Sequence, residues 1–100
     1  MTLKELTAKE VQEQLESGKE LNIIDVREDD EVAEGMIPGA EHIALGNLPV
    51  EMHELNTETP YILVCRSGGR SGRAQELMAD EGFDVTNMVG GMLAWEGETK

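Results

Sequence analysis

The chain has 100 residues, with 8 lysines and arginines against 21 aspartates and glutamates, so its formal net charge at pH 7 is −13. So acidic a chain is poorly suited to nucleic acid or to an anionic membrane surface, and we expect neither as a partner. The length suits one domain over residues 1–100 and is too short for two.

One cysteine cannot form an internal disulfide, and the chain contains two histidines. No apolar stretch has the length of a signal-peptide core or a transmembrane helix. We therefore expect a cytoplasmic protein with a free thiol.

The start of the chain predicts an edge strand followed by a surface helix. Leu3–Leu6 has the length of a short strand. Thr7 and Glu10 form a capping-box pattern, in which each side chain accepts a backbone N–H of the other residue. This pattern predicts a helix from about Ala8 to Ser17.

A second buried strand and a short helix follow. Leu21–Val26 predicts the strand, and Asp29–Glu34 predicts a helix that ends at Gly35. Asp25 then lies near the carboxyl end of its strand, where open α/β sheets bind ligands. It could orient a site or tie down a loop, and we favour the structural role, with Arg27 as an ion-pair partner.

The middle of the chain predicts a turn, a short strand and a helix, at Pro38-Gly39, Glu41–Ala44 and about Pro49–Leu55. In the helix we expect Val50 and Leu55 to point inward and His53 to face solvent. Either His42 or His53 could act as a base for a thiol, but neither has a partner motif. One cysteine and two isolated histidines also lack the spacing of metal ligands, so we expect neither a metal nor a cofactor.

The stretch from Tyr61 to Gly82 predicts a strand, a tight loop and a helix. Tyr61–Val64 is a continuous apolar run, typical of a strand covered on both faces in a parallel sheet. Cys65 follows, and then a loop with two glycines that permit positive φ. The helix after it carries apolar residues on one face and a glycine at its end: Ala74, Leu77, Met78 and Gly82.

This arrangement predicts an activated thiol at Cys65. A loop between the carboxyl end of a strand and a helix N-terminus presents N–H groups to an anion, and a thiolate held there is itself that anion. Such a cysteine should ionise near neutral pH and be nucleophilic. Three of the four arginines lie in or just after the loop, at Arg66, Arg70 and Arg73. We therefore expect a basic island that suits a small anionic substrate.

The end of the chain predicts a last strand at Val85–Val89, a turn at Gly90-Gly91 that lets backbone pass close to another segment, and a helical turn at Met92–Glu96. Trp95 is the only tryptophan, and we expect it in the core because its ring is so large.

Four stretches resemble, in order, the signatures of the rhodanese sulfurtransferase family. The loop from Cys65 to Ser71, of sequence Cys-Arg-Ser-Gly-Gly-Arg-Ser, resembles the family's active-site loop: cysteine, two variable residues, glycine, one variable residue, arginine and usually serine. Ile24–Glu28, Gly35–Ala40 and Gly90–Trp95 resemble the other signatures. One departure is Met36, where the family commonly has histidine.

The resemblance implies a three-layer α/β rhodanese-like domain, with a mainly parallel sheet of four or five strands and helices on both faces. The alternation of strand and helix patterns independently predicts the same class. The Cys65 strand should lie near the middle of the sheet. The family also has tandem members, and we expect this chain to be the single-domain form.

The resemblance further implies sulfur transfer. The Cys65 thiolate would take the outer sulfur of a small anionic donor, thiosulfate or a persulfide, and pass it to cyanide or to a thiol acceptor, either a small molecule or a protein. Cys65 and Arg70 would be catalytic. The remaining loop residues would bind substrate, namely Arg66, Ser67, Gly68, Gly69 and Ser71. Asp25 and Arg27 would have supporting roles.

Two other functions share this pattern. Rhodanese-like domains can be carrier or regulatory modules without turnover, although these usually lack the cysteine. The dual-specificity phosphatases of the same fold have five residues between their cysteine and arginine, whereas four separate Cys65 from Arg70. The shorter loop favours a sulfur atom over a phosphoryl group.

Overall fold

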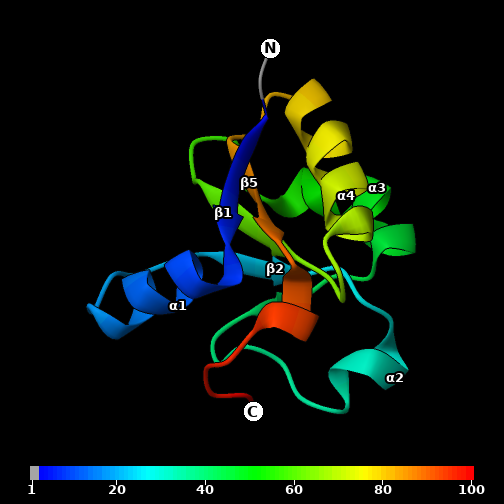
Figure 1. The fold of residues 1–100 in the computed structure, drawn as a ribbon. Coiled ribbons are helices and arrows are strands. Elements are labelled where there is room, and N and C mark those ends of the chain that lie inside the picture. Colours follow the sequence, from blue (N-terminus) through cyan, green and yellow to red (C-terminus); the bar gives the residue numbers. More distant parts are fainter. Residues whose placement is uncertain (1–2) are drawn as a thin grey trace.

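The computed structural model describes residues 3–100, in which five strands form one sheet of order β1-β5-β4-β2-β3 (Figure 1). The strands are β1 Lys4–Thr7, β2 Ile23–Asp25, β3 Glu41–His42, β4 Tyr61–Val64 and β5 Val85–Val89. Every neighbouring pair is parallel. The prediction of a parallel α/β sheet with the Cys65 strand at its middle is confirmed, since β4 has two strands on either side.

Within residues 3–100, four α-helices and two 3-10 turns lie between the strands, and a third 3-10 turn follows β5. They are α1 Ala8–Glu16, α2 Asp29–Val32, α3 Leu48–Glu51, α4 Gly69–Asp80, η1 Leu45–Asn47, η2 Met52–Glu54 and η3 Gly91–Ala94. In Figure 1, α3 and α4 lie on one side of the sheet and α1 on the other. Each side has its own apolar cluster: Leu63 and Met78 belong to the first, and Val11 and Met88 to the second. The molecule therefore has three layers, with the sheet between two helical layers.

The capping box predicted for α1 is present. The Glu10 N–H donates to Thr7 Oγ1 at 3.1 Å, and the Thr7 N–H donates to Glu10 Oε1 at 2.9 Å. These bonds satisfy two backbone groups that the helix leaves unpaired, so α1 begins where the sequence predicts. It places Val11 fully in the core.

The prediction for Val50 is wrong, because this side chain is 76% exposed. Leu48 and Met52 face the core instead. The segment divides into short helical turns, and its inward face repeats at the four-residue spacing of Leu48 and Met52, which leaves Val50 on the opposite side. Leu55 does pack against the core, and His53 is exposed as expected.

Trp95 is half-buried, so the prediction of a core position holds only in part. Its ring packs against the cluster that contains Val11, and its Nε1–H donates to the Glu98 carbonyl at 2.9 Å. The ring also lines a groove of about 460 Å³ with Leu15 of α1 and Pro38. The ring is therefore only partly enclosed, because it has core packing on one side and this groove on the other. No helix within residues 3–100 is both long enough and apolar enough to cross a membrane.

Candidate functional site

Cys65 leaves the centre of the sheet directly after β4, and only 1% of the residue is exposed. The Gly68 N–H donates to its Sγ at 3.0 Å, and the Ser71 hydroxyl lies 3.3 Å from the same sulfur. The helix α4 begins inside the motif, at Gly69, so the sulfur lies against a helix N-terminus. Gly68 has φ of +107°, and an added Cβ would lie 3.3 Å from the Gly90 nitrogen, so glycine suits this position on both counts.

The pKa of the Cys65 thiol lies below its ordinary value. Burial raises this pKa, but hydrogen bonds from the Ser71 hydroxyl and from the backbone N–H groups of Ser71, Gly68 and Ser67 lower it by more. As predicted, loop N–H groups face the sulfur, and they favour the thiolate.

Ser71 is held by Asn87, a residue that sequence reasoning missed. Asn87 lies on β5 and is 6% exposed. Its Oδ1 accepts from the Ser71 hydroxyl, and its Nδ2 donates to the Gly68 carbonyl at 3.2 Å. The available signal was an amide in the middle of a strand that also contains Val85, Met88 and Val89, because a buried amide needs partners.

The turn at Gly90-Gly91 supports the other side of the loop, as predicted. The Met92 N–H donates to the Cys65 carbonyl at 2.9 Å, and the Leu93 N–H donates to the Arg66 carbonyl at 3.0 Å. A Cβ on Gly91 would lie 2.4 Å from the Arg66 carbonyl oxygen, so only glycine allows this approach. The two hydrogen bonds fix the direction in which the chain leaves Cys65.

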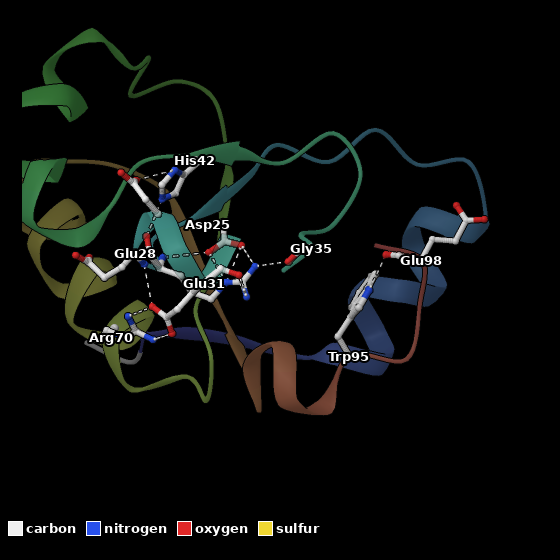
Figure 2. A network of polar contacts seen from close by, with 10 residues as sticks. Asp25, Glu28, Glu31, Gly35, His42, Arg70, Trp95 and Glu98 are labelled. Carbon is white, nitrogen blue, oxygen red and sulfur yellow. Dashed lines mark hydrogen bonds and ion pairs between the residues drawn. The ribbon is translucent and has the colours of Figure 1, made fainter. Parts of the chain in front are cut away.

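Arg70 points toward α2 and forms a two-pronged ion pair with Glu31 (Figure 2). Its Nη1 and Nη2 lie 2.6 and 2.7 Å from the two carboxylate oxygens. The hydrogen bonds from Arg70 lower the pKa of Glu31 to about 2, and Glu31 in turn raises the pKa of Arg70. Much of the charge of Arg70 is thus balanced within the protein. The sequence showed Glu31 only as one of many carboxylates and gave no sign of this partner 39 positions away.

Asp25 and Arg27 form a buried ion pair at the carboxyl end of β2. Arg27 Nη2 lies 2.8 Å from Asp25 Oδ2, and it also donates to the Gly35 carbonyl at 2.7 Å. The Arg27 guanidinium therefore bonds both the Asp25 carboxylate and the Gly35 carbonyl. His42 Nε2 lies 2.7 Å from the Arg27 carbonyl oxygen. The pair ties the end of β2 to the segment that carries α2, and this geometry agrees with the structural role favoured above.

A groove of about 410 Å³ opens beside the cysteine loop. Its lining combines two arginines, two glutamates and two apolar side chains: Arg27, Arg66, Glu31, Glu34, Met92 and Leu93. Arg66 is exposed, and no ion pair involves it within residues 3–100. The predicted basic island consisted of Arg66, Arg70 and Arg73. Of these, Arg66 lines the groove and is not paired with a carboxylate. Arg73 is exposed on α4. Leu93 is 68% exposed at the edge of the groove.

No cluster of three His, Cys, Asp or Glu side chains close enough to hold a metal ion occurs in the part of the chain that the structure describes. The site consists of one cysteine, backbone N–H groups and charged side chains. A parallel α/β sheet with a cysteine at the carboxyl end of its middle strand, facing a helix N-terminus, defines a class of proteins that hold an anionic sulfur there.

Comparisons with known proteins agree with this class. The family described as Rhodanese-like domain matches residues 7–98. A protein of Bacillus subtilis named "Putative sulfurtransferase YtwF" is 48% identical over 100 residues, which cover the whole of this chain and 97% of that protein. Thiosulfate sulfurtransferase GlpE of Pseudoalteromonas translucida is 37% identical over 75 residues, or 74% of this chain and 71% of that one.

Among solved structures, the crystal structure of a rhodanese-like domain protein from Staphylococcus aureus superposes with a TM-score of 0.92. It is 35% identical in sequence, and the match covers 98% of this chain and 97% of that one. The chain belongs to the rhodanese family.

Proposed function

We propose that this protein is a sulfurtransferase that carries sulfane sulfur as a persulfide on Cys65. The observation that carries the proposal is the position of the Cys65 sulfur, buried at a helix N-terminus with the Gly68 N–H 3.0 Å away. The lowered pKa of Cys65 supports it, because the thiolate is the nucleophile. Family membership and the relatives named as sulfurtransferases support it as well.

The reaction consists of two displacements. The Cys65 thiolate attacks the outer sulfur of the donor; with thiosulfate, the sulfur–sulfur bond breaks and its electron pair leaves with sulfite. Cyanide or an acceptor thiolate then attacks the outer sulfur of the persulfide, and the bond to Sγ breaks to restore the Cys65 thiolate. Neither step needs an oxidant, a metal or a cofactor, and the scheme predicts ping-pong kinetics.

The residues of the site have different roles in this reaction. The N–H groups of Ser67, Gly68 and Ser71 form a fixed cradle for the negative sulfur. Arg66 meets the charged end of the donor, because it is exposed and lines the groove. Arg70 is the catalytic arginine of the motif. It braces the loop through its ion pair with Glu31. It also adds a positive electrostatic field at Cys65, which the Glu31 carboxylate weakens. Asp25 and Arg27 have a supporting role, because their ion pair ties the end of β2 to the segment that carries α2 and Glu31.

Two observations favour this function over the alternatives. A carrier or regulatory module without turnover does not need an activated thiol. The hydrogen bonds that Cys65 accepts are those expected for an activated thiol. A phosphatase needs a ring of donors wide enough for three oxygens, and four residues between Cys65 and Arg70 form a smaller ring.

The experiment is turnover by the purified protein with thiosulfate or an organic persulfide as donor and cyanide or a thiol as acceptor. Cys65→Ser should abolish transfer at an unchanged circular dichroism spectrum, because the two side chains are nearly isosteric. Ser17→Ala is the control, since Ser17 is exposed at the end of α1 and its hydroxyl donates to the Gln14 carbonyl, far from Cys65 in the chain. Transfer retained by Cys65→Ser would exclude the mechanism.

A further inference from the structure

The Ser71 hydroxyl has one proton and three acceptors within reach. Its Oγ lies 3.3 Å from the Cys65 sulfur and 3.2 Å from the Gly68 carbonyl oxygen, and its shortest contact is with Asn87 Oδ1. A hydroxyl donates to one acceptor at a time in a linear hydrogen bond. The sulfur and the Asn87 carbonyl therefore compete for the same proton.

The orientation of the Asn87 amide is set by its other contact. Nδ2 donates to the Gly68 carbonyl, so Oδ1 must face Ser71; a flipped amide would bring two carbonyl oxygens together. Both Ser71 and Asn87 are buried, so neither can turn to water for a substitute partner. The hydroxyl can nevertheless turn about its Cβ–Oγ bond, which moves only the hydrogen.

We propose that Asn87 is a positioning residue that holds the Ser71 proton whenever the Cys65 sulfur is uncharged and yields it to the sulfur when a thiolate forms. A thiolate is a far stronger acceptor than a thiol or the inner sulfur of a persulfide. With a thiolate, the hydroxyl therefore turns to Sγ. With a thiol or a persulfide, it returns to Asn87 Oδ1, which otherwise lacks that partner.

This arrangement has a catalytic meaning that rests on the proposed role of Cys65. The inner sulfur is uncharged in the persulfide and gains its charge as the acceptor removes the outer sulfur. The Ser71 proton thus reaches Sγ as that charge develops, so the hydroxyl stabilises the leaving thiolate without binding the persulfide equally well. Asn87 also favours the uncharged sulfur and so keeps the pKa of Cys65 higher than Ser71 alone would set it.

The first test uses the wild-type protein and needs no sulfur donor. The pH dependence of Cys65 alkylation gives the midpoint of its ionisation, and NMR follows the side-chain amide of Asn87 across the same range. We expect the Asn87 signal to shift with the Cys65 midpoint and this shift to disappear in Ser71→Ala. An Asn87 signal that stays constant through the Cys65 titration would overturn the proposal.

The second test is a double-mutant cycle on the alkylation midpoint. Ser71→Ala should raise the midpoint by about one pKa unit, as expected when a thiolate loses a charged hydrogen bond. The same change should have a larger effect in the Asn87→Leu background, where the Asn87 oxygen no longer competes for the hydroxyl and only the Gly68 carbonyl does. Equal shifts in both backgrounds would also overturn the proposal.

Two features keep the result specific. Gln75→Leu is the matched control, because it removes another buried amide that bonds two backbone carbonyls, those of Lys4 and Val85, and it should leave the Cys65 midpoint unchanged. None of these variants changes a charged group, so a change in the Cys65 midpoint cannot come from a lost or gained charge. The charged groups at the site are Arg66, Arg70 with Glu31, and Asp25 with Arg27. β5 and η3 bring no charged residue. Because neither readout uses sulfur transfer, failure of the proposed function would be seen separately.

Discussion

Arg66 and Arg70 belong to the same motif, yet the structure gives them different environments. Arg70 is bound at both nitrogens by Glu31, whereas Arg66 is exposed beside the groove. A guanidinium that already holds a carboxylate has little capacity left for a second anion. We therefore propose that recognition of an anionic donor falls to Arg66, and that Arg70 acts mainly on the shape and field of the loop.

Arg66→Gln should raise KM for thiosulfate about tenfold, with a smaller change in kcat, because it removes a charged contact made in both the bound and the reacting complex. Steady-state kinetics with a fixed acceptor measure this. Arg73→Gln is the matched control, since it removes the same charge from an exposed position on α4 and should change KM little. Equal KM values for the two variants would assign the donor contact to another group.

Glu31 makes the free energy of unfolding depend on pH in the acid range. Its pKa is about 2 in the folded protein against 4.5 ordinarily, so the ion pair stabilises the fold fully above about pH 4.5 and loses this effect as pH falls toward 2. Glu31→Gln should lower the free energy of unfolding at pH 7 by about 1 kcal/mol, because the pair is partly exposed. Urea unfolding of both proteins from pH 7 to pH 3 should show the gap shrinking below pH 4.5. A gap that is constant over this range would exclude a stabilising charge at Glu31.

At the scale of elements, the cysteine loop is held between two segments that approach it from opposite sides. The β5–η3 connection binds the backbone of Cys65 and Arg66, while α2 binds Arg70. The backbone contacts depend on Gly91, which has φ of +56° and no room for a Cβ. The shape of the loop is therefore a product of tertiary contacts as well as of its own glycines.

Gly91→Ala should lower the free energy of unfolding by about 3 kcal/mol or more and raise the alkylation midpoint of Cys65, because the new methyl group would displace the Arg66 carbonyl. Gly18→Ala is the control: its φ is also positive, +88°, but its Cβ would meet nothing within 4 Å. It should cost only about 1 to 2 kcal/mol of backbone strain and leave Cys65 unchanged. If the two variants behave alike, the close approach of Gly91 has no bearing on the loop.

Patterns that depend on neighbours in the chain were the predictable part. The capping box of α1, the apolar run of β4 and the glycine turn before η3 each carry their own local cause, and all three are confirmed. The prediction that Val50 points inward was wrong. In so short a helical segment, which contains Pro49, the apolar residues fit more than one choice of inward face. Glu31 and Asn87 could not be found, since a hydrogen bond across 39 or 16 positions leaves no local trace in the sequence.

The whole molecule combines a net charge of −13 with one exposed guanidinium beside a buried sulfur. The acidic surface repels anions in general, so the exposed guanidinium of Arg66 beside the groove gives an anionic donor a local attraction.

The central claim is that Cys65 carries a single sulfur atom, and intact-protein mass spectrometry after incubation with thiosulfate tests it most directly. The account predicts a gain of about 32 Da located at Cys65, removal of that mass by a reducing thiol, and its absence in Cys65→Ser. It also predicts no turnover of an aryl phosphate, because four residues between Cys65 and Arg70 leave room for one sulfur and not for a phosphoryl group. Ready hydrolysis of the aryl phosphate without any mass gain from thiosulfate would contradict the account.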